Sequence, residues 1–295
     1  MEKSAMITIC GRPNVGKSTL TNALVGEKIA IVSDKPQTTR NRITAIVEHG
    51  ETQLVLMDTP GFHKPRTRLG DYMVNVVSQS VADVDLVLLL VEPVAEIGKQ
   101  EEGLIARLRE TGAPAVLVIN KIDTVERPRL LEVMALYSAT YDFGAIIPIS
   151  AKTGEGIPEL LDEMENYAVE GPHLFPDDMI TDQPERQICA ELVREKLLKC
   201  LDKEIPHGTA VEVTHFTERD NGIIDLEVTI YCEKDSHKGI IIGKKGAMLK
   251  RIGELARKDI EEFMGTKANL QTWVKVKENW RDSTSLLRNF GFKNE

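Results

Sequence analysis

Residues 6–19 read Met-Ile-Thr-Ile-Cys-Gly-Arg-Pro-Asn-Val-Gly-Lys-Ser-Thr, and this stretch decides the fold. Its apolar beginning predicts a buried strand, and the apolar spacing that follows, through Leu20 and Leu24, predicts a helix ending at Gly26. Between them lies GxxxxGKS, in which the glycines let backbone N–H groups turn toward one anion. The helix dipole, the ammonium of Lys17 and the Mg²⁺-ligating hydroxyl of Ser18 complete such a site. The stretch therefore predicts a nucleotide-binding loop formed by Gly11, Asn14, Val15, Gly16, Lys17, Ser18 and Thr19.

Length and composition indicate a soluble protein of two domains. The chain has 295 residues, of which 42% are hydrophobic and 28% charged, as is usual for globular proteins. No apolar run approaches the ~20 residues that a membrane-spanning helix needs, and the first strand begins too early to leave room for a signal peptide. We therefore expect a cytoplasmic protein.

Charge is distributed unevenly along the chain. The formal net charge is −9, which by itself argues against nucleic acid as a partner. Residues 1–181 carry this excess, however, whereas residues 182–295 hold equal numbers of acidic and basic side chains. Within residues 236–258 the basic side chains are opposed only by Glu254, so we expect a local basic patch there.

A second motif follows a predicted hairpin. Residues 43–47 and 54–57 read as two strands, and the second runs into Asp58-Thr-Pro-Gly61, a DxxG. A carboxylate at the end of a strand in an α/β sheet can hold the water shell of a metal, and the Gly61 N–H can contact a terminal phosphate. The alternative interpretation is a plain turn.

A third motif would choose the base. A predicted strand at 115–119 runs into Asn120-Lys121-Ile122-Asp123, or NKxD. A fixed carboxylate at Asp123 would accept hydrogen bonds from guanine that adenine cannot donate in the same arrangement. Asn120 would tie this loop to the phosphate loop, and the stem of Lys121 would lie along the base. The alternative for Asp123 is a helix cap. A weaker signal, Ser150-Ala151-Lys152, could supply a backbone N–H to the base.

The elements alternate between strand and helix, which predicts a doubly wound α/β fold with a mostly parallel sheet. All three motifs should then lie at the carboxyl edge of the sheet. The remaining predicted elements are helix 72–81, strand 86–91, helix 100–110, helix 129–138, strand 145–149 and helix 157–168.

Order and spacing of these motifs resemble the Ras-like P-loop GTPases. The resemblance implies that Thr39, or less favourably Thr38, is the switch threonine that ligates Mg²⁺ together with Ser18 and, through water, Asp58. It implies catalytic roles for Lys17, Thr39, Gly61 and Asn14. It also implies slow intrinsic turnover, because Phe62 stands where the family has a water-orienting glutamine. In relatives with the same loop an asparagine at the position of Asn14 binds K⁺; here the alternative is a structural loop asparagine.

A break without periodicity at 171–182 predicts a linker between a domain over residues 1–170 and a second, smaller α+β domain over 183–295. A helix beginning near Pro184 would bury Ile188, Leu192, Leu197 and Leu201. The charge run at 191–199 is expected to be a solvated face. A hairpin, a helix at 247–263, a strand at 270–277 and a short C-terminal helix follow.

A GxxG, Gly243-Lys-Lys-Gly246, lies between two predicted helices, and its basic surroundings fit close approach of a nucleic-acid backbone, as in the KH fold. The order helix–strand–strand–helix–helix–strand resembles the type II KH arrangement. The alternative is a solvated basic helix. The expected RNA-binding residues are Lys238, Gly239, Ile240, Ile241, Ile242, Gly243, Lys244, Lys245, Gly246, Lys250 and Arg251.

A GTPase domain followed by one type II KH domain resembles the Era family of GTPases over essentially the whole chain. The resemblance implies a monomeric switch that binds GTP, GDP and Mg²⁺, recognises the 3′ region of small-subunit ribosomal RNA and assists small ribosomal subunit maturation. Peripheral contact with the inner membrane stays open. Two rival hypotheses are a constitutive RNA-binding protein with a mainly structural nucleotide domain and, less favoured, a small-molecule kinase.

Overall fold

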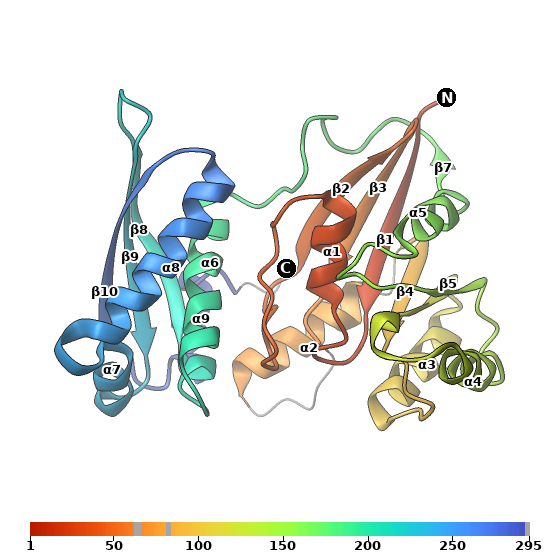
Figure 1. Cartoon of the computed structure of the whole chain (residues 1–295), viewed down its shortest axis with the longest axis horizontal. Helices are drawn as coiled ribbons and strands as arrows, with labels where there is room; N and C mark the ends of the chain where they lie inside the picture. The colour runs from red at the N-terminus through yellow and green to blue at the C-terminus, as the bar shows by residue number, and fades with distance from the viewer. Residues whose placement is uncertain (62–66, 81–83, 293–295) are drawn as a thin grey trace. The chain divides into compact units, whose positions relative to one another are not determined.

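The computed structural model describes residues 1–61, 67–80 and 84–292 (Figure 1). It divides into two compact units. The first comprises residues 1–30, 39–61, 73–80 and 84–182, and the second comprises residues 31–38, 67–72 and 183–292. Two short segments, 31–38 and 67–72, therefore pack with the second unit although the chain on either side of each belongs to the first.

The first half of the chain alternates between strands and helices. The elements are β1 (Lys3–Cys10), α1 (Lys17–Val25), β2 (Ile43–His49), β3 (Thr52–Asp58), α2 (Arg68–Ser80), β4 (Leu86–Val91), α3 (Lys99–Thr111), β5 (Ala115–Ile119), α4 (Arg127–Ser138), β6 (Ala145–Pro148), α5 (Ile157–Glu165) and β7 (Val169–Glu170). Helix α2 begins at Arg68, earlier than the predicted Tyr72, because Thr67 caps its N-terminus: the Thr67 hydroxyl oxygen accepts from the N–H of Gly70 at 3.2 Å, and its carbonyl oxygen accepts from the N–H of Asp71 at 3.0 Å. The predicted end of that helix, Val81, lies outside the described residues.

The sheet of the first unit is mostly parallel. Its strand order is β2-β3-β1-β4-β5-β6, with β7 paired to β1. Strands β2 and β3 form the expected antiparallel hairpin, whereas β1 pairs in parallel with both β3 and β4, β4 with β5, and β5 with β6. The doubly wound α/β prediction is confirmed. Because parallel strands end at the same edge, the loops after β1, β3, β4, β5 and β6 come together.

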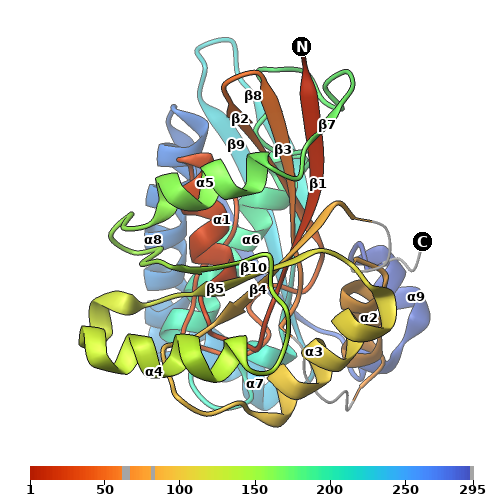
Figure 2. The ribbon, with the colours of Figure 1, turned by 90° about the vertical axis from the view of Figure 1, so that its right-hand side faces the viewer.

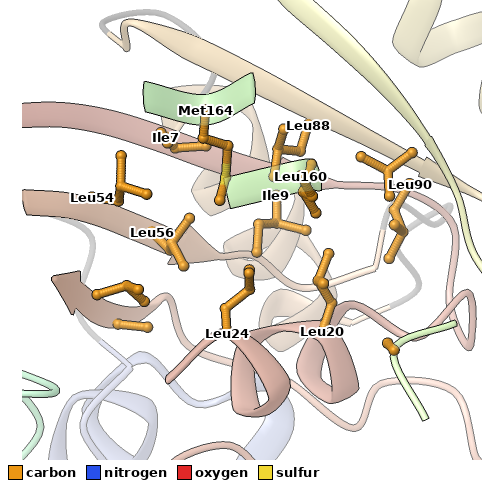
Figure 3. Close-up of a cluster of buried hydrophobic side chains, with 14 of the residues drawn as sticks. Ile7, Ile9, Leu20, Leu24, Leu54, Leu56, Leu88, Leu90, Leu160 and Met164 are labelled. Carbon is orange, nitrogen blue, oxygen red and sulfur yellow. The ribbon is translucent and has the colours of Figure 1, made fainter. Parts of the chain in front are cut away.

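Period-two alternation divides the apolar side chains between the two faces of this sheet. Ile9 and Leu88 belong to the cluster beneath α1 and α5, which Figure 3 shows with Leu20 and Leu160. Their neighbours Cys10 and Leu89 belong to a separate cluster with α3 and α4 on the opposite face (Figure 2). With both faces covered, the sheet is a rigid support for the loops at its edge.

The second unit holds the C-terminal elements. These are α6 (Glu185–Cys200), β8 (Ala210–Glu218), β9 (Ile224–Cys232), α7 (Asp235–Ile242), α8 (Ala247–Met264), β10 (Ala268–Val276) and α9 (Thr284–Asn289). Strand β9 pairs antiparallel with β8 and parallel with β10. The order helix–strand–strand–helix–helix–strand is the one expected for a type II KH domain.

The charge run on α6 was expected to be a solvated face, but its central residues are buried. Arg194, Glu195 and Lys196 are consecutive, and all three are buried, at 2%, 0% and 5% exposure. Lys196 lies against Asp259 of α8, whereas Arg194 and Glu195 bond to segment 31–38. The prediction was wrong because helical periodicity alone does not show that a helix is covered on more than one side.

None of the described helices is both long and apolar enough to cross a bilayer.

Candidate functional site

Residues 11–16 form the turn between β1 and α1, as the sequence predicts. Gly16 has a φ of 103°, and a Cβ built there would lie 2.3 Å from the side-chain nitrogen of Asn120. A Cβ on Gly11 would lie 2.5 Å from the carbonyl oxygen of Leu90. A side chain at either position would collide with the backbone of β4 or with Asn120, which is why this turn needs glycine at both ends.

Lys17 begins α1 and folds back over the loop. Its ammonium donates hydrogen bonds to the carbonyl oxygens of Gly11 at 3.1 Å and Arg12 at 3.0 Å. Burial lowers the pKa of Lys17 below its usual value, and the nearby Asp58 carboxylate opposes this effect. A buried cation that lies over a glycine-rich turn is suited to bind phosphate oxygens.

Three oxygen-bearing side chains from separate elements meet beside the loop. The Ser18 hydroxyl lies 2.8 Å from that of Thr39 and donates to the carboxylate of Asp58 at 2.8 Å. Asp58 is fully buried, and its Oδ1 has no hydrogen-bond partner among the described residues. Burial raises the pKa of Asp58 to about 6, although Lys17 and Ser18 oppose this shift. Hydroxyl and carboxylate oxygens are the ligands Mg²⁺ prefers, so these residues fit that ion.

The structure distinguishes the two candidate threonines. The hydroxyl of Thr38 donates to the carbonyl oxygen of Lys35 at 2.6 Å, away from Ser18. Thr39 is buried, and its hydroxyl is the one next to Ser18. The geometry favours Thr39.

Asn120 joins three loops. Its side-chain amide donates to the carbonyl oxygen of Val15 in the phosphate loop at 2.8 Å, and its oxygen accepts from the N–H of Ala151 at 2.9 Å. Asn120 is 2% exposed, so both bonds are made away from water, where an unpaired amide would be costly. The N–H of Ala151 is engaged by this bond, which leaves other groups of Ser150-Ala151-Lys152 to face a base.

The carboxylate of Asp123 is held by the hydroxyl of Ser150. Its Oδ1 accepts from the hydroxyl of Ser150 at 2.7 Å, while the residue as a whole is exposed. An aspartate fixed by one hydroxyl keeps acceptor capacity for two N–H donors of a planar ring. Lys121 donates to the carbonyl oxygen of Asn14 at 2.7 Å, which places its stem beside the phosphate loop.

Glu92 and Arg12, which the sequence analysis did not identify as site residues, link the phosphate loop to the loop that carries Asp123. Glu92 follows β4 directly and accepts hydrogen bonds from both Arg12 and Lys121. Partial burial alone would raise the pKa of Glu92, but these two cationic donors lower it below its ordinary value. Arg12 also lies 3.4 Å from Glu101. The signal that could have found Glu92 is the one used for Asp58, an acid at the carboxyl end of a parallel strand.

Asn14 and Gly61 lie where backbone geometry is constrained. Asn14 is in the left-handed region with a φ of 66°. A Cβ on Gly61 would lie 2.9 Å from the Cα of Pro13, so Gly61 approaches the phosphate loop closely. Phe62, the expected substitute for a water-orienting glutamine, lies outside the described residues.

The GxxG forms the turn between α7 and α8 in the second unit. Gly243 has a φ of 71°, and a Cβ there would lie 2.7 Å from that of Met248. Gly246 has a φ of 79° with open space around it, and the intervening Lys244 and Lys245 are exposed. The exposed Lys250 and Arg251 follow on α8. The loop thus presents backbone and cations together, which suits a phosphodiester chain.

The three isoleucines before the GxxG have different environments. Ile240 is 49% exposed, Ile242 is partly buried, and Ile241 is fully buried in the core of the second unit. Direct RNA contact, expected for all three, is excluded for Ile241 because its side chain has no exposed surface. Ile241 supports the loop from below, and Ile240 remains an apolar surface residue beside Lys238 and Gly239.

Two families match separate parts of the chain. A family described as 50S ribosome-binding GTPase matches residues 6–121, and the KH domain family matches residues 204–281. The GTPase Era of Ruminiclostridium cellulolyticum is 53% identical over 291 residues, covering 99% of this chain and 98% of that protein. The GTPase Era of Clostridium kluyveri is 51% identical over 293 residues, covering 99% and 100%.

Two crystal structures are similar over the whole chain. A point variant of Aquifex aeolicus Era bound to GDP·AlF4⁻ is 35% identical with a TM-score of 0.95, covering 99% of this chain and 100% of that one. Era in complex with MgGDPNP and nucleotides 1506–1542 of 16S ribosomal RNA gives the same identity and TM-score and covers 100% of both chains.

Glu92 provides a test of the site geometry. Glu92→Gln keeps the size of the side chain but removes the charge that holds Arg12 and Lys121. We expect bound guanine nucleotide to dissociate about fivefold faster, as losing about 1 kcal/mol from a partly exposed charge pair would cause. The measurement is displacement of a fluorescent guanine nucleotide by an unlabelled one. Glu96→Gln, at an exposed position of the same loop, is the matched control. Equal release rates in both variants would contradict the role given to Glu92.

Proposed function

The chain belongs to the Era family of GTPases, and from this premise we propose that it is a GTP-controlled switch acting on the 3′ region of small-subunit ribosomal RNA. In this proposal it works as a cytoplasmic monomer and assists assembly of the small ribosomal subunit. Residues 1–170 bind and hydrolyse the nucleotide, residues 183–295 form the RNA-binding KH domain, and 171–182 link them.

A single observation supports the nucleotide site: groups for phosphate, metal and base meet at one edge of the sheet. Lys17 covers the phosphate loop, Ser18, Thr39 and Asp58 meet beside it, and Asn120 ties that loop to the one carrying Asp123. The last of these contacts joins Asn120 to Val15, 105 positions away in the chain.

We assign the Mg²⁺ contacts to Ser18 and Thr39 directly and to Asp58 through water. Mg²⁺, when bound, neutralises negative charge on the β- and γ-phosphates. Lys17 and the loop amides orient the same phosphates, and the Gly61 N–H faces the terminal one. Asp123 selects guanine, and Asn120 keeps the base loop at a fixed distance from the phosphate loop.

The switch mechanism draws support from the composition of the second unit. Segments 31–38 and 67–72 flank Thr39 and Gly61 closely in sequence, yet they pack with the elements that carry the GxxG. Within this unit the backbone N–H of Arg68 donates to Asp282 at 3.1 Å, and Arg68 also donates to the hydroxyl of Thr284 at 2.7 Å. Ordering of Thr39 and Gly61 by GTP would therefore alter how the GxxG surface is presented.

The two rivals explain less. A small-molecule kinase would not need the Asp123 arrangement, and a constitutive RNA-binding protein would not need Thr39 beside Ser18 and Asp58.

We also propose slow intrinsic hydrolysis, with K⁺ at Asn14 compensating for the absent glutamine.

The K⁺ hypothesis predicts faster hydrolysis in K⁺ than in Na⁺, because the larger ion suits a site built on Asn14 and phosphate oxygens. We expect at least a fewfold difference in phosphate release, lost in Asn14→Gly, which keeps the left-handed backbone. The control is Asn279→Gly, another asparagine of positive φ, at 52°. Equal rates in the two salts would remove this hypothesis.

Asp123→Asn tests the choice of base. The amide cannot accept both guanine N–H donors, so affinity for GDP should fall at least about hundredfold, while xanthosine diphosphate should bind better. Titration calorimetry measures both. Asp142→Asn, an exposed aspartate in the loop before β6, should leave both affinities unchanged. If Asp123→Asn keeps its preference for GDP, the base assignment fails.

The central experiment measures RNA binding in each nucleotide state. The purified full chain is crosslinked to total ribosomal RNA with a non-hydrolysable GTP analogue or with GDP, and the recovered RNA is sequenced. We expect fragments from the 3′ end of the small-subunit RNA, enriched with the GTP analogue. Equal recovery in both states would favour the constitutive rival, and absence of that RNA would contradict the assigned partner.

Variants at Gly246 show whether that RNA contacts the GxxG. Gly246→Asp places a carboxylate where phosphates would approach, and we expect RNA affinity to fall at least tenfold with nucleotide affinity intact. Gly246→Asn demands the same left-handed backbone without the charge, so it should bind RNA better than the aspartate variant. Equal RNA affinity in the two variants would exclude an electrostatic contact there.

A further inference from the structure

Segment 31–38 is anchored within the second unit by groups of α6 and the residues directly after it. Ile31, 2% exposed, is part of the unit's apolar core. The N–H of Val32 donates to the carboxylate of Glu195 at 3.0 Å. Lys35 donates to the carbonyl oxygen of Leu201, where α6 ends, and lies 3.6 Å from Asp202. A cation at this end of a helix is favoured by the helix dipole.

Arg194 makes the anchor nearest to the metal-facing residues. Its guanidinium donates to the carbonyl oxygen of Thr38, and Glu191 orients it through bonds of 2.8 Å to Nε and 2.6 Å to Nη2. Glu191 and Arg194 are three residues apart on α6, so their side chains lie on the same face of the helix. The arginine is thereby pre-oriented toward segment 31–38.

Because Arg194 and Glu195 are buried, losing their hydrogen bonds to segment 31–38 would be costly. The side chains of Arg194 and Glu195 are 2% and 0% exposed. A buried charge that loses a partner keeps its desolvation cost, so Arg194 and Glu195 each favour the conformation of segment 31–38 that supplies the missing bond. Glu195 is additionally paired with Lys196 and, at 3.1 Å, with Lys199, which fixes its carboxylate facing Val32.

We infer that Arg194 and Glu195 are positioning residues for Thr39, the proposed Mg²⁺ ligand, and this inference rests on the function proposed above. Thr39 follows Thr38 directly, so the bond from Arg194 to the Thr38 carbonyl sets the direction in which the chain enters Thr39. With its own hydroxyl bonded to Lys35, Thr38 is locked into this turn. This turn leads the chain into Thr39, whose hydroxyl lies 2.8 Å from that of Ser18.

The same contacts couple α6 energetically to nucleotide binding. If the anchors favour the conformation in which Thr39 reaches Mg²⁺, then binding of Mg²⁺ and GTP must favour the anchors by the same free energy. In the function proposed above, Thr39 ligates Mg²⁺ only when the γ-phosphate is present, so GDP should exert no such effect. Helix α6 belongs to the unit that carries the GxxG, and this makes it the element that senses GTP.

The test compares two arginines of α6. Arg194→Met retains the aliphatic stem but removes the donor to Thr38. Arg186→Met makes the same change at an exposed arginine of the same helix, which donates at 2.7 Å to the carbonyl oxygen of Val213 instead. For each full-length variant, the apparent Mg²⁺ affinity is measured with a fluorescent non-hydrolysable GTP analogue and with fluorescent GDP.

We expect Arg194→Met to weaken Mg²⁺ binding about tenfold in the GTP-analogue complex and to leave GDP affinity unchanged, as loss of one charge-assisted hydrogen bond would. Arg186→Met should change neither quantity. Lys35→Met, which removes a different anchor of segment 31–38, should shift the Mg²⁺ affinity in the same direction. Equal behaviour of the two arginine variants, or an equal loss for GDP, would overturn the inference.

Thr39→Ala separates this inference from the proposal on which it rests. If Thr39→Ala leaves Mg²⁺ affinity in the GTP-analogue complex unchanged, the proposed ligand is wrong. If it weakens that affinity, the double variant of Thr39→Ala and Arg194→Met decides. A positioning role predicts no further loss beyond Thr39→Ala alone, because Arg194 acts through Thr39, whereas a purely structural role predicts that the two losses multiply.

Discussion

Parallel pairing of β1 with its neighbours β3 and β4, extended through β5 and β6, is the constraint on which the site depends. Parallel strands end at the same edge. The phosphate loop, Asp58, Glu92, Asn120 and Ser150 are therefore brought together, although each lies at or just after the end of a different strand. Antiparallel pairing of any of these strands would send its functional residue to the opposite edge. Apolar clusters on both faces make the arrangement rigid enough to hold several charges out of water.

Buried polar bonds then convert proximity into fixed geometry. Asn120 bonds to Val15 and Ala151, and Glu92 joins Arg12 to Lys121, so the four loops that carry these residues are held at fixed distances from one another. Burial lowers the pKa of Lys17 and raises that of Asp58, and the attraction between the two opposite charges opposes both shifts. Such charges are costly without partners, and a nucleotide with Mg²⁺ is a partner that satisfies both signs.

The second unit uses the same principle for another purpose. Its helix α6 buries consecutive charged residues, which destabilises the unit unless each finds a partner. Lys196 finds Asp259 within the KH elements, while Arg194 and Glu195 find backbone groups of segment 31–38. A segment that belongs by sequence to the nucleotide-binding half is thereby held to the helix that opens the RNA-binding half. In the proposed switch, a response to GTP then needs no contact between nucleotide and RNA.

Local sequence determined the elements and the chemistry, because strand and helix periodicity, the glycine turn of GxxxxGKS and the motifs around Asp58, Asp123 and Gly243 depend on residues close together in the chain. Alternation of strands and helices further implied a parallel sheet and hence one functional edge. Only the tertiary structure decided that Thr39 rather than Thr38 meets Ser18, that Glu92 bridges two loops, that Ile241 faces the core and that the charges of α6 are buried. Each of these depends on which distant segment covers a given face, and neither spacing nor composition within a helix or strand carries that information.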